Sequence, residues 1–293
     1  MDTSAQLYES EATGWKRGLY EDVKGTFRAP FVNWIFRTAM ANEPALLRYA
    51  WGQVNPVFGT RAFGEFATAY RDEILSVDTE FDLPSYRRET LGVRPPEYRE
   101  LRGQLATFDV VAPRLLVLFE LMDRALHDEP VGVEPDESRS ATEPLPSWLD
   151  RGRGAPPTMV GADDVPDQLD DTLDSLRRYH GLDDSLPSIY RCLAQWPEYL
   201  STAWRDLEPV LESEAFADAR AGGDERVGAF VDATPYRPRL DSETLRKLGF
   251  ESESIEGMQS LFAGFNDDPV RSVVATLPVW AATVDAGGER TLH

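Results

Sequence analysis

One stretch of this chain is written twice, and the repetition constrains the fold more than any other feature of the sequence. Residues 41–63 and 194–216 share nine identities over 23 positions when the chain is shifted by 153. In the first copy the identical residues are Ala41, Pro44, Leu47, Ala50, Trp51, Pro56, Val57, Ala62 and Phe63. A second echo, between "LATFDVVAPR" from Leu105 and "LFAGFNDDPVR" from Leu261, keeps the same order along the chain. We infer a tandem duplication.

The residues of each copy recur with helical spacing. Leu47, Ala50 and Trp51 follow the i, i+3, i+4 pattern of one helix face, as do their counterparts in the second copy. Pro44 and Pro197 stand in the expected first turn of a helix, where a missing backbone N–H costs little. Strand signals are scarce. The sequence therefore predicts an all-α fold in which two tandem helical repeats form an intramolecular pseudo-dimer, with any pocket at the seam between them.

A stretch rich in Pro, Gly and acidic residues lies between the two copies. It spans residues 127–164 and is the only breaker-rich segment long enough to be a linker. The predicted organisation is an N-terminal helical repeat over 1–126, a linker over 127–164 and a C-terminal helical repeat over 165–293.

Acidic residues dominate the charge. The chain carries 51 Asp and Glu against 30 Lys and Arg, a net charge of −21, and only three of its cations are Lys. This balance argues against nucleic acid as a partner, because phosphate binding needs clustered Lys and Arg. It resembles the composition of cytoplasmic proteins from extremely halophilic archaea, in which concentrated salt screens the self-repulsion. We expect the protein to lose structure in low salt.

Other cofactor and compartment signals are sparse. The single cysteine, Cys192, excludes an intramolecular disulfide and reads as a small buried apolar residue. The three histidines, His127, His180 and His293, show no metal-ligand spacing, so no metal site is predicted. No run reaches the roughly 18 apolar residues of a membrane-spanning helix, and the first residues do not resemble a signal peptide. We expect a cytoplasmic protein with no membrane partner.

Several segments together resemble the group I 2-haloacid dehalogenase family. They are "YEDVKGTFRAPFVNWIFR", "SIYRCLAQWPEYL" after "RRYHGL", and the two echoes built on Phe-Asp and Phe-Asn. The similarity runs in the same order from about Tyr20 to Trp280. It implies two related helical repeats with the active site between them, and pairing of the whole chain into a homodimer. It also implies hydrolysis, without a cofactor, of 2-halocarboxylic acids by a directly activated water, with inversion and no covalent ester.

The resemblance also assigns roles to particular positions. The family's catalytic Asp, which follows Ser and precedes an aromatic residue, falls on Ile189, between Ser188 and Tyr190. Isoleucine has no lone pair and cannot take a proton from water. The first-repeat segment that carries the family's amides reads "FDVVAP" here, which places Asp109 and Ala112 at those positions. Its second-repeat twin keeps an amide as Asn266, on the other half.

The aromatic lining of the site is better preserved. Phe31 and Trp34 match the family's aromatic pair that contacts the apolar part of the substrate. Together with Ser188 and Tyr190 they form the predicted substrate-binding set. A small carboxylic acid is the expected ligand.

Three interpretations of function remain open at this point. The chain is a dehalogenase with impaired or diverged activity, a non-catalytic protein that binds a small acid or another metabolite, or a structural protein in which Ile189 fills the hollow. A rebuilt site could use Asp109, Asp183, Asp184 or His180 as the base. The competing interpretations are a solvated turn for Asp183 and Asp184, a structural capping or surface role for Asp109, and a packing or capping role for His180.

Overall fold

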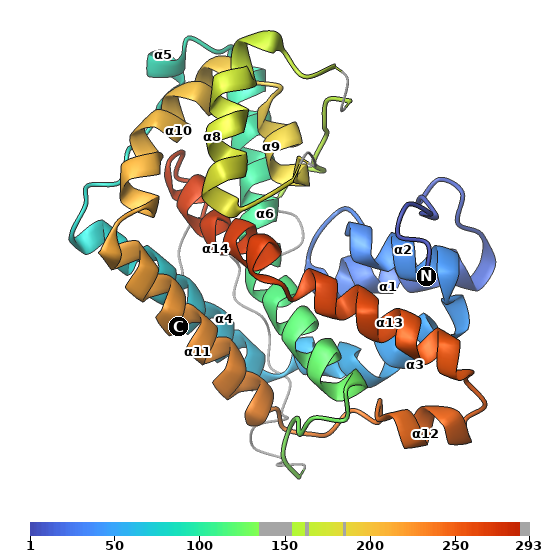
Figure 1. Ribbon diagram of the computed structural model, residues 1–293. Coiled ribbons are helices and arrows are strands. Elements are labelled where there is room, and N and C mark those ends of the chain that lie inside the picture. The colour runs from blue at the N-terminus through green and yellow to red at the C-terminus, as the bar shows by residue number, and fades with distance from the viewer. Residues whose placement is uncertain (135–153, 162–163, 184–185, 288–293) are drawn as a thin grey trace.

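The computed structural model describes residues 1–134, 154–161, 164–183 and 186–287, and within them the regular structure is helical with no strand (Figure 1). The all-α prediction is confirmed. The helices are α1 (Gly14–Phe27), α2 (Trp34–Asn42), α3 (Pro44–Val54), α4 (Arg61–Ile74), α5 (Arg88–Leu91), α6 (Pro95–Leu126), α8 (Asp170–His180), α9 (Ser188–Leu193), α10 (Pro197–Leu211), α11 (Glu214–Asp232), α12 (Ser242–Lys247), α13 (Ser252–Phe265) and α14 (Asp268–Ala282). Short 3₁₀ turns at Asn55–Gly59, Leu75–Thr79 and Asp167–Leu169 complete the regular structure.

Helix α6 is the central element of the fold. It runs for 32 residues and continues through Pro113. A proline inside a helix removes one backbone hydrogen bond and costs about 3 kcal/mol. The residues around it, from Leu101 to Leu126, are mostly buried, and their packing offsets this cost. Helices α11, α13 and α14 all pack on α6 (Figure 1).

Helices from the two halves of the sequence share one hydrophobic core. Helix α4 packs along α11, where the ring of Phe66 stacks on Phe230 with centroids 4.8 Å apart. Gly223 allows this close approach, because a Cβ there would lie 3.0 Å from the ring of Tyr70. Buried apolar residues from Ala12 to Val284 form a single continuous cluster. Burial of this surface is the main source of stability.

The repeated sequence gives the same helix starts in both halves. Pro44 and Pro197 occupy the first turns of α3 and α10, as predicted. Thr60 caps α4 by accepting a hydrogen bond from the backbone N–H of Phe63 (3.1 Å), and Ser213 caps α11 by accepting one from Phe216 (3.2 Å). Both caps were missed in the sequence, although a Ser or Thr at the start of an amphipathic stretch is a readable signal.

Most of the predicted linker lies outside the described residues. Its described ends contact both halves of the sequence: Val133 donates its backbone N–H to Thr234, and Ala155 donates to Gly103. The limits 1–126, 127–164 and 165–293 stay a prediction. Within the described residues, no helix combines the length and the apolar character that crossing a bilayer requires.

Candidate functional site

The predicted aromatic lining contacts helices from both halves of the sequence. Phe31 is half-buried, and its ring lies 6.3 Å from that of Phe108 on α6. Trp34 begins α2, is 41% exposed, and meets the edge of Phe265 on α13 at 5.3 Å. Phe108 and Phe265 are the two residues that the second sequence echo pairs with each other. The segment from Phe31 to Trp34 therefore contacts both copies of the second repeated stretch, at Phe108 on α6 and at Phe265 on α13.

The short helix α9 carries the other predicted site residues. Ile189 is 2% exposed, and Ser188 before it is half-buried. Tyr190 is fully buried, lies 6.0 Å from the ring of Trp280, and makes a hydrogen bond to His180. Its hydroxyl therefore points into the second-half core and is engaged there, whereas Trp34 faces solvent. The structure does not bring the rings of Tyr190 and Trp34 together as one lining.

His180 is a buried, neutral member of a polar chain. Its Nε2 lies 2.5 Å from the Tyr190 hydroxyl and its Nδ1 lies 2.8 Å from the hydroxyl of Ser272 on α14. Burial lowers the pKa of His180 to about 3, and the positive charge of Arg220 lowers it in the same direction. A general base works best with a pKa near the working pH, so this environment makes His180 a poor base near neutrality. Both ring nitrogens have structural partners.

Asp109 is buried in an ion pair on α6. One of its carboxylate oxygens lies 2.7 Å from the guanidinium of Arg71 on α4, and both side chains are at most 3% exposed. Ala112, one turn further along α6, is fully buried. Asp183 is exposed, and Asp184 lies outside the described residues. Of the proposed replacement bases, Asp109 thus has a defined structural partner that the sequence did not predict.

Asn266, the amide of the second echo, belongs to a network of charged side chains at the end of α13. Its amide nitrogen donates to Asp123 (2.9 Å) and Glu120 (3.2 Å) on α6. Its amide oxygen accepts a hydrogen bond from Arg271 (2.7 Å). Arg271 also pairs with Glu120 and Asp224. The amide therefore joins α13 and α14 to α6.

Gln104, which the sequence analysis missed, joins α6, α9 and the segment at residues 158–160. Its side-chain oxygen accepts hydrogen bonds from the Cys192 thiol (2.7 Å) and from the backbone N–H of Thr158 (3.0 Å). Arg191 fixes the same segment by donating to the carbonyl of Val160 (2.9 and 3.1 Å). Burial raises the pKa of the Cys192 thiol, so it stays protonated and is no nucleophile. The sequence alone does not show which residues a side-chain amide such as that of Gln104 contacts.

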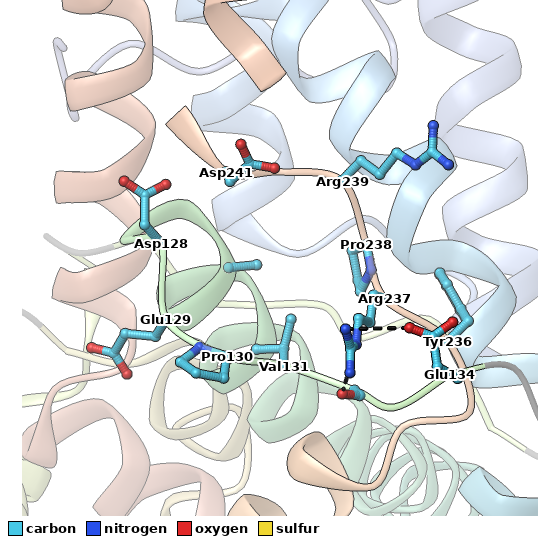
Figure 2. A pocket seen from close by; sticks show the side chains of 12 residues that line it. Asp128, Glu129, Pro130, Val131, Glu134, Tyr236, Arg237, Pro238, Arg239 and Asp241 are labelled. Carbon is cyan, nitrogen blue, oxygen red and sulfur yellow. Dashed lines mark hydrogen bonds and ion pairs between the residues drawn. The ribbon is translucent and has the colours of Figure 1, made fainter. Parts of the chain in front are cut away.

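Two pockets lie away from all these residues. The larger, of about 670 Å³, lies between the chain after α6 and the loop before α12 (Figure 2). Two of its charged groups hold these loops, since Arg237 pairs with Glu134 and Asp241 caps α12. A second pocket, of about 480 Å³, has Arg87, Arg88 and Arg99 among its lining. The described residues contain no group of three His, Cys, Asp or Glu that could hold a metal ion.

Comparison with known proteins gives a consistent set of relatives. The family described as "Halocarboxylic acid dehydrogenase DehI" matches residues 30–165. The (R)-2-haloacid dehalogenase of Pseudomonas putida is 24% identical over 263 residues, which cover 83% of this chain and 82% of that protein. The configuration-inverting 2-haloacid dehalogenase of Pseudomonas sp. (strain 113) is 26% identical over 72% of this chain and 69% of its own length.

A solved structure shares the fold over almost the whole chain. It is a D-2-haloacid dehalogenase mutant in complex with D-2-CPA, with a TM-score of 0.78, 21% identity and coverage of 95% of this chain and 94% of that one. A D-2-haloacid dehalogenase with L-LA gives a TM-score of 0.77 at the same identity. Sequence relatives and fold agree: the chain is similar to 2-haloacid dehalogenases over most of its length, and nearly half of it matches the DehI family.

Proposed function

We propose that this protein binds a short 2-halocarboxylic acid between α2 and α9, and that its hydrolytic activity is impaired or diverged because Ile189 stands where the family has its catalytic Asp. The observation that carries the proposal is the continuous similarity to 2-haloacid dehalogenases over more than four fifths of the chain. Phe31 and Trp34, which contact Phe108 and Phe265, supply the aromatic surface for the apolar end of such a ligand. Two halves arranged as a pseudo-dimer would place this site at their seam.

The proposed reaction needs a general base, which is absent at position 189. A water molecule attacks C2 of the acid, its oxygen forms the new C–O bond as the C–halogen bond breaks, and the halide leaves with the bonding electrons. A base must take the proton of the water, and such general-base catalysis contributes about 10²–10⁴-fold. Ile189 offers no acceptor. The ion pair of Asp109 and the low pKa of His180 both speak against their acting as substitutes.

Two other proposals remain, each with its own support. A non-catalytic small-acid binder would keep the aromatic surface and need no base. A structural protein would use Ile189 as a packing residue, in keeping with its 2% exposure. In every case we propose a cytoplasmic, halophilic homodimer that needs no cofactor, supported by the net charge of −21 and the family resemblance.

The test compares wild type with Ile189→Asp and Ile189→Asn in molar KCl. Each enantiomer of 2-chloropropionate is supplied, and lactate is measured by chiral chromatography, because the buffer masks released chloride. The Asn variant matches the Asp variant in size but lacks the base. Circular dichroism confirms that both variants fold.

We expect wild type and Ile189→Asn to stay at background, and Ile189→Asp to exceed Ile189→Asn by at least about 100-fold. Turnover by wild type would contradict impaired activity and require another base. A folded but inactive Ile189→Asp variant, together with no binding of the acid to wild type, would favour the structural protein.

A further inference from the structure

The smaller of the two pockets, of about 480 Å³, lies beside α5 and the first turns of α6. Helix α5 lies at the opposite end of the molecule from α12 and the larger pocket (Figure 1). The residues that line the smaller pocket are Arg87, Arg88, Glu89, Pro95, Tyr98 and Arg99. Three positive charges and one negative charge therefore surround a single cavity, in a chain whose net charge is −21.

Two of the three arginines have no partner for their guanidinium groups. Neither Arg87 nor Arg99 forms an ion pair or a side-chain hydrogen bond within the described part of the chain, and both residues are exposed. Because the two side chains line the same cavity, their N–H donors are available to one ligand.

The third arginine is already paired inside the pocket. Arg88 donates to the carboxylate of Glu89 through its Nε (3.1 Å) and one terminal nitrogen (2.5 Å). The backbone N–H of Glu89 and the guanidinium of Arg88 lower the pKa of this carboxyl, as does the charge of Arg87. Glu89 therefore stays ionised and compensates one of the three positive charges. A ligand with two negative charges would balance the other two.

Hydrogen bonds anchor the backbone around this pocket. The hydroxyl of Thr90 donates to the carbonyl of Arg87 (2.7 Å) and accepts the backbone N–H of the same residue (3.1 Å), which fixes the start of α5. The hydroxyl of Tyr98 on α6 donates to the carbonyl of Tyr86 (2.7 Å). Tyr86 in turn donates its hydroxyl to Asp206 on α10 (2.6 Å). The pocket is thus formed before any ligand binds, which lowers the cost of ordering it.

The chemistry of the lining favours a phosphate group attached to a small organic group. Helix α6 begins with Pro95 and Pro96, which have no backbone N–H to offer an anion, so side chains must supply the donors. Guanidinium groups match the oxygens of a phosphate in bidentate geometry. The ring of Tyr98 and Pro95 add apolar surface. A volume of about 480 Å³ lies within the range of small-molecule sites and exceeds what a bare phosphate fills.

We propose that this pocket binds a small organic phosphate. Arg87 and Arg99 bind the phosphate oxygens, and the organic group lies against Tyr98 and Pro95. The inference goes beyond the proposed function, because this pocket shares no residue with the proposed acid site. It holds whether or not the protein hydrolyses 2-halocarboxylic acids.

The test measures binding by ligand-observed NMR in molar KCl, with phenyl phosphate, inorganic phosphate and phenol as probes. Arg87→Gln and Arg99→Gln each remove one unpaired charge, and Glu89→Gln removes the carboxylate that competes with the ligand. Arg17→Gln and Arg178→Gln are matched controls, because both arginines are exposed, lie outside the pocket and have no ion pair among the described residues. Circular dichroism confirms that each variant folds.

We expect phenyl phosphate to bind wild type more tightly than inorganic phosphate or phenol does. Arg87→Gln and Arg99→Gln should each weaken binding of phenyl phosphate about tenfold, whereas the two control variants should bind it like wild type. Glu89→Gln should strengthen binding about threefold, because the guanidinium of Arg88 is released from a surface ion pair. A general loosening of the pocket would not produce this opposite sign.

Four results would overturn the inference. The first is no binding of phenyl phosphate to wild type, and the second is equal binding to wild type, Arg87→Gln and Arg99→Gln. The third is an equal loss of binding in the control variants, because net charge alone would then explain it. The fourth is phenol binding as tightly as phenyl phosphate, which would make the pocket an apolar site. None of these results would alter the outcome of the test at Ile189.

Discussion

The two tryptophans at the matched positions of the repeat lie in different surroundings. Trp51 packs against a cluster of phenylalanines, Phe27, Phe36 and Phe58, and its indole N–H donates to Asp22 at 2.6 Å. Trp204 stacks on Trp280 with centroids 6.4 Å apart, and its indole nitrogen has no acceptor among the described residues. The same residue at the same helical position therefore anchors two different regions of the one hydrophobic core, the first-half core around Trp51 and the second-half core around Trp204.

The polar groups inside the two cores differ even more. The first-half helices α4 and α6 bury a charged pair, Arg71 and Asp109. The second-half helices α8, α9 and α14 bury the neutral groups His180, Tyr190 and Ser272. At an offset of 153 the residues at the helix starts are identical or similar, whereas the buried polar groups of the two halves differ. The helix starts are thus independent of the polar groups that the helices enclose, and the proposed loss of a catalytic Asp at position 189 is compatible with an intact fold.

The largest expected effect is on the charged pair. Asp109→Asn leaves the guanidinium of Arg71 buried without its carboxylate, which costs about 3–5 kcal/mol of unfolding free energy. Chemical denaturation in molar KCl measures this loss. Glu73→Gln is the control, because Glu73 pairs with Arg226 at the surface and such pairs contribute less than about 1 kcal/mol. A cost for Asp109→Asn as small as that of the control would show that the first-half core does not depend on a buried charge.

The second prediction concerns the neutral core and pH. The folded pKa of His180, about 3, lies below its unfolded value of about 6.5, so below pH 6.5 the unfolded state binds a proton that the folded state does not. The His180 contribution to stability should therefore be lost as the pH falls from about 6.5 toward 3, at up to about 1.4 kcal/mol per pH unit.

Denaturation of wild type and His180→Gln at a series of pH values isolates this contribution from that of the carboxylates. The variant should lose the part of the pH dependence that begins near pH 6.5. An unchanged pH dependence in His180→Gln would mean that the imidazole is accessible to protons, contrary to its burial.

The sequence predicted the helices of this molecule better than the contacts between its buried side chains. Helical spacing and the prolines at 44 and 197 identified α3 and α10, because these signals are local. The partner of Asp109 could not be predicted, because Arg71 meets it only when α4 packs on α6. For the same reason the sequence did not single out Gln104, whose partners Thr158 and Cys192 lie 54 and 88 residues further along the chain.

The smallest expected effect tests whether the helix starts are equivalent. Thr60→Ala and Ser213→Ala each remove a side chain that accepts a hydrogen bond from the backbone of Phe63 or Phe216 and donates one to the carbonyl of Val57 or Val210. Each should cost about 1 kcal/mol of unfolding free energy, measured by thermal or chemical denaturation in molar KCl. Ser252→Ala, at the exposed start of α13 and without a capping hydrogen bond, should change stability by less than about 0.5 kcal/mol. Equal costs at 60 and 213 would support a common frame for the two halves. A difference above about 1 kcal/mol would instead mean that the greater burial of Thr60 outweighs the shared geometry, and that the caps have diverged along with the cores they precede.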